Sequence, residues 1–202
     1  MSRSGFIAPE LVPLCGRLAD AFDVFASELA ALTQDDFIPW FDYDVYSGEW
    51  FVYPIVARLD PLPLGFDLDR ARRQCPRSSA LLAQEPQVLL AGFSRLMPGT
   101  FIRPHTDRPG VDVLRFHLGF GPQPCAELEF PGERRVTGRR HHLLIDHSMT
   151  HSSQNQGALP RDVLLVDIRL GPAEAAAVRA VRGDVHLGRT AYRPDEDARQ
   201  ST

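Results

Sequence analysis

The clearest alternation of apolar and polar residues runs from residue 114 to residue 120. Every second residue there is apolar, and the residues between them include Arg115 and His117. Because successive side chains of a strand point to opposite faces, this segment predicts a strand with one apolar face and one face that carries Arg115 and His117. The apolar face consists of Leu114, Phe116, Leu118 and Phe120.

Short runs rich in aromatic and β-branched residues, separated by turns, predict further strands. Residues 37–56 predict two strands around a turn at Ser47 and Gly48, and residues 163–170 predict a strand that is apolar on both faces apart from its ends. The other predicted strands lie at residues 87–97, 101–106, 126–130, 134–136 and 143–145. About eight short strands framed by helices predict a mainly β protein with flanking helices, a cupin-like double-stranded β-helix or jelly roll.

Helical spacing of leucine and phenylalanine between residues 9 and 33 predicts an amphipathic helix on the outside of the domain. A short helix broken at Pro76 is predicted at residues 70–83, and an alanine-rich helix from residue 172 to about Val181. A length of 202 residues suits one well-buried domain. We therefore predict a single domain over residues 1–202, with helical support at 9–33, a jelly-roll core at about 37–170, and a C-terminal helix and tail at 172–202.

Composition narrows the class of protein. The formal net charge of −4 argues against a nucleic-acid or anionic-membrane binder. The three cysteines are odd in number and form no C-x-x-C pair, which predicts no disulfide framework and favours a reducing compartment. No apolar run approaches the ~20 residues of a membrane span, and the first residues lack the apolar segment of a signal peptide. We expect a cytoplasmic protein that binds neither nucleic acid nor membrane.

A candidate metal site begins at His105 and Asp107. Their i, i+2 spacing places both side chains on one face of a strand, and a second histidine from a distant segment would complete two imidazoles and one carboxylate. That donor set is the facial triad of non-haem Fe(II) oxygenases, which leaves coordination positions open. An H-x-D pair alone also arises by chance. Three histidines without a partner at useful spacing are interpreted as packed or surface residues: His141, His142 and His186.

Arginines in predicted strands indicate that an anion binds near the candidate metal site. Arg115 shares a strand face with His117, and Arg161 opens the strand that is otherwise apolar. An arginine inside a barrel is costly unless it is paired. A small dicarboxylate would pair with it, because the planar guanidinium matches a carboxylate.

Five segments of the chain, in order and at near-correct spacing, resemble one family. They are residues 94–100, 104–106, 114–119, 146–151 and 161–168. Together they resemble the aspartyl/asparaginyl β-hydroxylase family of Fe(II)/2-oxoglutarate-dependent dioxygenases. The resemblance implies that His105 and His151 are iron ligands and that Ser94 and Arg161 hold the distal carboxylate of 2-oxoglutarate. It also implies that Arg115 and His117 contact this co-substrate near its metal-binding end.

One position departs from the family. In its animal enzymes the residue two after the first histidine is glycine, and two histidines alone hold the iron, whereas here the residue is Asp107. The alternative is that Asp107 faces solvent beside Arg108 in a surface turn. We favour ligation by His105, Asp107 and His151, because the spacing fits and a carboxylate is the expected third donor.

The resemblance implies a hydroxylase that uses Fe(II), 2-oxoglutarate and O2 on an unactivated carbon. The expected position is the β-carbon of an aspartyl or asparaginyl group in a peptide, a carrier-bound or a free amino acid. Trp50 and Arg103 are candidates for contact with this small-molecule or peptide substrate; the alternatives are a core tryptophan and a surface arginine. A different class, a non-oxygenase cupin-like binding protein or isomerase, would have no need of Arg161 at its spacing from His151.

Overall fold

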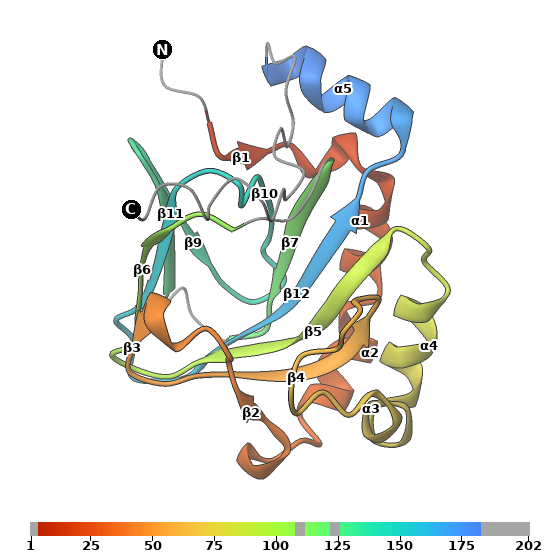
Figure 1. Cartoon of the computed structure of the whole chain (residues 1–202), viewed down its shortest axis with the longest axis vertical. Coiled ribbons are helices and arrows are strands. Elements are labelled where there is room, and N and C mark those ends of the chain that lie inside the picture. Colours follow the sequence, from red (N-terminus) through yellow and green to blue (C-terminus); the bar gives the residue numbers. More distant parts are fainter. Residues whose placement is uncertain (1–3, 108–111, 122–125, 183–202) are drawn as a thin grey trace, which may run out of the picture.

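Two antiparallel sheets face each other in the structure, a computed structural model that describes residues 4–107, 112–121 and 126–182 (Figure 1). The predicted tail, His186 and Arg108 lie outside these described residues. The large sheet contains β1 (Phe6–Ile7), β10 (His142–Ile145), β7 (Val113–Gly119), β12 (Arg161–Arg169), β5 (Val88–Leu96), β4 (Trp50–Ala57) and β2 (Ile38–Pro39), in that order. The small sheet contains β3 (Tyr46–Ser47), β6 (Phe101–His105), β11 (His151–Asn155), β8 (Ala126–Phe130) and β9 (Glu133–Thr137).

The eight strands from β5 to β12 form a double-stranded β-helix. Within the large sheet, β5 pairs with β12, β12 with β7, and β7 with β10. Within the small sheet, β6 pairs with β11, β11 with β8, and β8 with β9. The chain therefore passes repeatedly from one sheet to the other, which is the jelly-roll arrangement. The predicted fold class is confirmed.

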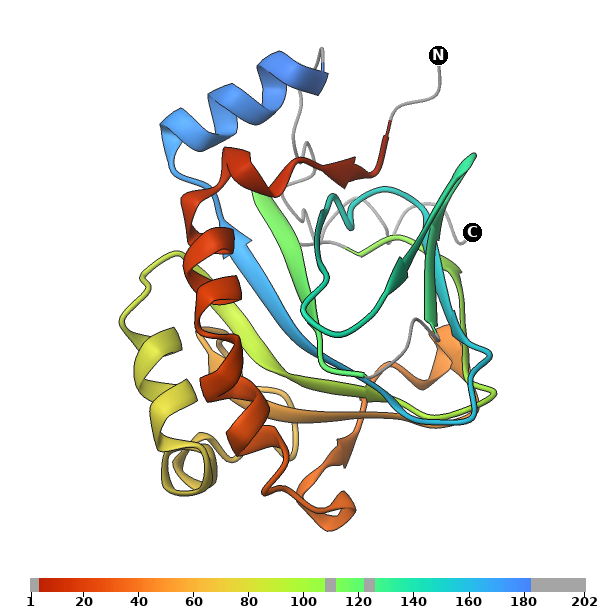
Figure 2. The ribbon, with the colours of Figure 1, turned by 180° about the vertical axis from the view of Figure 1, so that it is seen from behind.

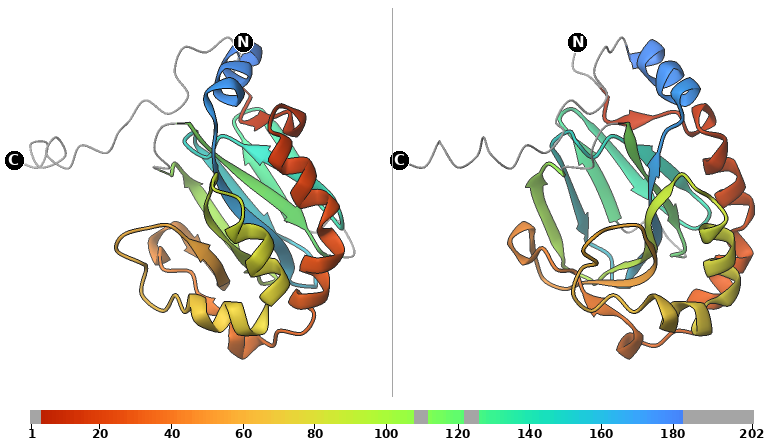
Figure 3. Two further views of the ribbon diagram at one scale, coloured as in Figure 1. Left: turned by 90° about the vertical axis from the view of Figure 1, so that its right-hand side faces the viewer. Right: turned by 45° about the vertical axis from the view of Figure 1, so that its right-hand side comes forward.

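Helices cover the outer face of the large sheet (Figures 2 and 3). The predicted helix at 9–33 is divided into a 3-10 turn (Pro9–Leu11), α1 (Pro13–Asp20) and α2 (Phe22–Leu29). The break predicted at Pro76 separates α3 (Leu68–Gln74) from α4 (Pro76–Ala83), and α5 (Pro172–Arg182) follows β12. No helix in the described part of the chain has the length and apolar character to cross a membrane.

The main hydrophobic core lies between this helical layer and the large sheet. Phe22 and Phe25 of α2 belong to the same buried cluster as Leu114, Phe116 and Leu118 of β7. Since these β7 residues alternate with Arg115 and His117, the polar pair points to the other side, into the space between the two sheets. The packing of the outer face thus fixes which side chains enter the interior of the jelly roll.

The segment at residues 37–56, predicted as two strands around a turn, divides between the two sheets. β3 pairs with β6 in the small sheet, whereas β4 pairs with β2 and β5 in the large sheet. Gly48, between β3 and β4, has a φ of 93°, and a Cβ there would lie 2.7 Å from Thr100 Oγ1. The predicted turn is therefore present, but it carries the chain from one sheet to the other.

Candidate metal centre

The two histidines that the sequence singled out lie directly opposite each other in the small sheet. His105 ends β6, His151 begins β11, and the antiparallel register pairs the two residues. Their ring centroids are 4.4 Å apart. Residues from segments far apart in the chain therefore form one cross-strand pair of imidazoles.

Hydrogen bonds to the backbone fix the orientation of both rings. Nδ1 of His105 lies 2.8 Å from the carbonyl oxygen of Arg103, and Nδ1 of His151 lies 2.9 Å from that of Met149. A carbonyl oxygen only accepts, so each Nδ1 carries a hydrogen, and Nε2 is the ring nitrogen that is left to bind a metal. Burial lowers the pKa of His151 to about 4, which keeps this ring neutral.

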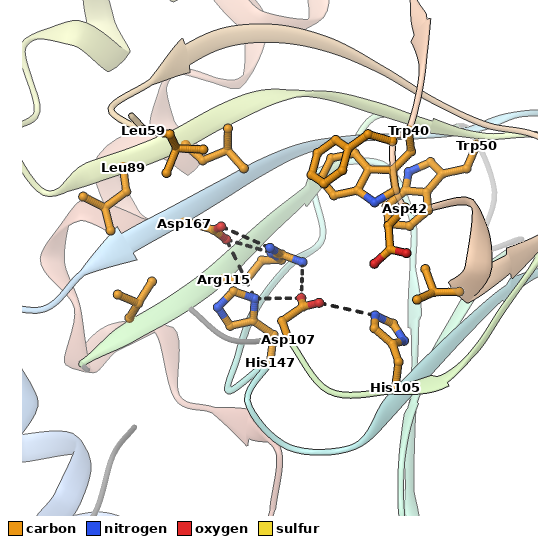
Figure 4. A pocket seen from close by; sticks show the side chains of 14 residues that line it. Trp40, Asp42, Trp50, Leu59, Leu89, His105, Asp107, Arg115, His147 and Asp167 are labelled. Atoms are coloured by element: carbon orange, nitrogen blue, oxygen red, sulfur yellow. Dashed lines mark hydrogen bonds and ion pairs between the residues drawn. The ribbon is translucent and has the colours of Figure 1, made fainter. Parts of the chain in front are cut away.

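Asp107 completes the group. The ligand atoms of His105, Asp107 and His151 all lie within 4.8 Å of one another, and Asp107 Oδ1 is 3.6 Å from His105 Nε2. The carboxylate points toward the histidines and buried donors rather than into a solvent-facing turn (Figure 4). Two imidazole nitrogens and one carboxylate oxygen fit a divalent transition metal such as Fe(II).

Donors from β7 and from the turn that follows β10 hold the other oxygen of Asp107. Arg115 Nη1 donates to Asp107 Oδ2 at 2.7 Å, and His147 Nδ1 lies 3.1 Å from the same oxygen. Arg115 Nε and Nη2 donate to the two oxygens of Asp167 at 2.7 and 3.0 Å. Burial alone would raise the pKa of Asp107, but the charge of Arg115 and the hydrogen bond from His147 lower it below its usual value. The carboxylate is therefore ionised and oriented.

A second polar cluster lies deeper between the sheets. Ser94, His117 and Arg161 are 1%, 6% and 5% exposed, and they line one cavity together with His105 and His151. Trp50 Nε1 donates to Ser94 Oγ at 2.9 Å, so the serine hydroxyl hydrogen remains available to another acceptor. This cavity joins the candidate metal ligands to the buried arginine.

The protonation of His117 follows from its neighbour. Its Nδ1 lies 3.4 Å from Arg161 Nη2, and a guanidinium only donates, so Nδ1 accepts and Nε2 carries the hydrogen. Burial and the charge of Arg161 hold the pKa of His117 well below its usual value. Its Nε2 is buried and has no hydrogen-bond partner among the described residues. A buried N–H beside a guanidinium suits an anionic oxygen of a ligand.

Residues 19–170 match the family model described as Aspartyl/Asparaginyl beta-hydroxylase. The chain belongs to this family. Among named relatives, aspartate beta-hydroxylase domain-containing protein 2 of Rattus norvegicus is 33% identical over 142 residues, which cover 66% of this chain and 39% of the rat protein. Aspartate beta-hydroxylase domain-containing protein 1 of Homo sapiens is 36% identical over 81 residues, 39% of this chain and 20% of that protein. The chain thus spans about two fifths or less of the length of these curated relatives.

Solved structures with a similar course of the chain are more distant in sequence. A predicted oxalate decarboxylase from Thermotoga maritima superposes with a TM-score of 0.45 at 13% identity, covering 66% of this chain and 92% of that chain. The cupin 2 domain of an XRE family transcriptional regulator from Enterobacter cloacae gives a TM-score of 0.41 at 12% identity, covering 60% and 98%.

In this β-hydroxylase family member, the structure brings together seven of the nine predicted site residues around the deep cavity and the metal ligands. They are Ser94, His105, Asp107, Arg115, His117, His151 and Arg161. Trp50, the eighth, is 6% exposed, consistent with a core residue, and it also lines the cavity. Their predicted roles toward iron and co-substrate remain predictions, since the structure shows only their positions.

Because Arg103 lies two residues before His105, strand alternation predicts that both side chains point to the same side, and this prediction is wrong. Its guanidinium donates to the carbonyl oxygen of Asp44 at the surface. The pairing of β6 with β11 shifts register between Ser153, opposite Ile102, and His151, opposite His105. This bulge adds a residue to β6, so the i, i+2 alternation breaks and Arg103 turns outward. A role of Arg103 in substrate binding stays a prediction.

Two residues of the site were not found from the sequence. Asp167 binds Arg115, and His147 binds Asp107. A signal for Asp167 was present, because a lone carboxylate near the end of an apolar buried strand needs a cationic partner. His147 lies within the segment 146–151 that carried the family resemblance, but no spacing rule connected it to Asp107.

Proposed function

We propose that this protein is an Fe(II)- and 2-oxoglutarate-dependent dioxygenase that hydroxylates an unactivated carbon. One observation carries the proposal: His105 and His151 of the candidate metal group line a buried cavity that is also lined by Arg161 and by His117, whose Nε2 has no partner among the described residues. A metal-binding donor set next to a buried, cation-lined cavity suits an anionic co-substrate that reaches the metal.

The metal would be held by Nε2 of His105, Nε2 of His151 and Oδ1 of Asp107. When bound, Fe(II) supplies oxygen activation, with 2-oxoglutarate as the reductant that becomes succinate and carbon dioxide while one oxygen atom enters the substrate. Arg115 and His147 keep Asp107 ionised and turn its second oxygen away from the metal side. Arg115 and His147 would therefore act by positioning the carboxylate of Asp107 that binds the metal.

Arg161 and Ser94 would bind the distal carboxylate of the co-substrate. The guanidinium supplies the positive charge, and the Ser94 hydroxyl, which accepts from Trp50, can donate its own hydrogen to the carboxylate. His117 would donate from Nε2 to an oxygen nearer the metal. Because all three side chains are buried, water is excluded and their electrostatic attraction for the dianion is strengthened.

For Arg115 the contacts favour a different role from the one the resemblance implied. Three of its nitrogens donate to Asp107 and Asp167. We therefore propose that it orients the metal-binding carboxylate, while its predicted contact with the co-substrate remains a prediction. The reacting position that family membership favours is the β-carbon of an aspartyl or asparaginyl group in a peptide, a carrier-bound or a free amino acid.

Anaerobic titration of the purified protein with Fe(II) and then 2-oxoglutarate tests the proposal. We expect the charge-transfer absorption of an iron-bound 2-oxoacid, and succinate release after oxygen is admitted. The Arg161→Met variant should bind metal normally and lose the absorption at the same co-substrate concentration. Absence of both the absorption and succinate in the wild type contradicts the proposal and favours a non-oxygenase cupin-like binding protein or isomerase.

Replacing Asp107 by Gly tests the third ligand separately. We expect metal affinity to fall by at least about tenfold, because an anionic ligand is lost and Arg115 loses one of its two partners. Metal binding is measured by calorimetry, which is independent of turnover. Unchanged affinity would show that two histidines suffice, as in the animal enzymes of the family.

A further inference from the structure

A second pocket of about 340 Å³ lies on the outer side of His105 and Asp107. One wall is aromatic: the rings of Trp40 and Trp50 stack with centroids 4.5 Å apart and planes 14° apart. Phe41, 49% exposed, stacks on Trp40 at 4.6 Å and extends this wall to the surface. The pocket is thus a largely apolar approach to the candidate metal ligands.

Its charged residues are mostly carboxylates. Among the described residues that line the pocket, Asp42, Asp107 and Asp167 face one arginine, Arg115. Arg115 is already paired with Asp107 and with Asp167. Asp42 has no hydrogen bond or ion pair from its carboxylate to the part of the chain that the structure describes.

Asp42 is directed toward the pocket. It precedes the 3-10 helix Tyr43–Val45, yet its side chain makes no hydrogen bond to the backbone of that helix, which is the usual partner of an aspartate in this position. In Figure 4 the carboxylate lies beside the two tryptophan rings and faces the space above His105. A cation in this space would meet a carboxylate beside the aromatic wall.

We propose that the substrate presents, next to its reacting carbon, an apolar or aromatic group that lies against Trp40 and Trp50 and a protonated amine that pairs with Asp42. This deepens the proposed function and rests on it, because the pocket counts as a substrate site only if the metal centre is catalytic. An acidic group in place of the amine would meet Asp42 and, among the described lining residues, no arginine that is not already paired.

Intrinsic fluorescence gives a direct test, because the chain contains two tryptophans and both line this pocket. Three probes of similar shape differ in charge: 2-phenylethylamine, 2-phenylethanol and 3-phenylpropionate. Each is titrated into the protein in EDTA, so that no probe binds through a metal ion. We expect the amine to bind most tightly and the carboxylate most weakly.

The Asp42→Asn variant should raise the dissociation constant of the amine roughly two- to fivefold, the range of a solvent-accessible ion pair, and leave that of the alcohol unchanged. Asp44→Asn is the matched control. Asp44 is exposed in the 3-10 helix that follows Asp42 and does not line the pocket, so this variant should bind the probes as the wild type does. Trp40→Ala should weaken all three probes.

The proposal is overturned if the carboxylate binds as tightly as the amine, if Asp42→Asn leaves the preference unchanged, or if no probe perturbs the fluorescence. These measurements need neither iron nor 2-oxoglutarate. Conversely, charge-transfer absorption and succinate release do not depend on Asp42. Failure of the substrate inference and failure of the oxygenase proposal are therefore distinguishable.

Discussion

The two faces of β7 are buried alike but differ in chemistry. On the outer face, Leu114, Phe116 and Leu118 are at most 1% exposed and pack under the helices. On the inner face, Arg115 and His117 are 8% and 6% exposed and face the two polar clusters. The outer face contributes to stability through area removed from water, whereas the inner face needs a partner for every charge it buries. Neighbouring residues of β7 thus serve different purposes, since those on the outer face stabilise the fold and those on the inner face line the candidate site.

The largest expected effect comes from the outer face. Phe116→Ala removes a fully buried ring from the core beneath α2 and should lower the free energy of unfolding by about 3–5 kcal/mol. The folded fraction should bind metal with wild-type affinity, because the inner residues keep their contacts. Denaturant titration and calorimetry check the two parts. A lower metal affinity in the folded protein would show that the two faces are coupled.

On the inner face, Asp167→Asn should act on the metal site. Asp167 holds Arg115 in bidentate fashion, and Arg115 holds Asp107. Loss of such a supporting contact should reduce metal affinity about 10- to 100-fold, measured by calorimetry.

A control for this variant is available on the same strand. Asp162 accepts two hydrogen bonds from Arg95, at 2.8 and 3.0 Å, in an equivalent pairing between β12 and β5. Asp162→Asn should therefore leave metal affinity unchanged. Equal losses in both variants would indicate a general loosening of β12 instead of a specific support of Asp107.

The smallest effect concerns pH. The pKa of His151 is about 4 in the folded protein, against an ordinary value of 6.5, and that of His117 is also lowered. Between pH 4 and pH 6.5 the His151 ring is protonated in the unfolded chain but neutral in the folded protein, so the unfolded chain binds more protons. The free energy of unfolding is therefore highest above pH 6.5 and falls as the pH decreases toward 4. Denaturant titrations in EDTA at pH 7 and pH 5 should show this loss.

Variants assign that pH dependence to the inner face. The His151→Gln variant should lose less stability than the wild type between pH 7 and pH 5. His141→Gln, which changes an exposed histidine, should keep the wild-type dependence. If His151→Gln shows the full dependence, protonation of His151 does not contribute to it.

Periodicity predicted much of the fold and part of the site. Alternation along residues 114–120 gave the correct faces of β7, because burial of one face enforces a period of two. It failed at Arg103, where the bulge inserts a residue, so that Arg103 and His105 no longer share a face. Alternation is reliable inside a regular ladder and uninformative across a register shift.

Contacts that depend on strand register or on the course of a loop could not be predicted from the sequence. Asp167 lies beside Arg115 because β12 pairs with β7 in one register, which no local pattern specifies. Trp40 and Asp42 reach the outer pocket from the loop before β3, whose course depends on the passage of the chain from one sheet to the other. The metal-binding residue types could be read from the sequence, but the residues that support and surround them could not.

The bulge in β6 also sets the spacing between the residues of this strand that face the deep cavity. His105 stands opposite His151 because β6 contains one residue more than its partner between the paired positions. Ile102 and His105 both line the deep cavity although they are three positions apart in the chain, a spacing that regular alternation would place on opposite faces. The number of residues between the inward-facing positions of β6 therefore belongs to the description of this site as much as the identity of those residues does.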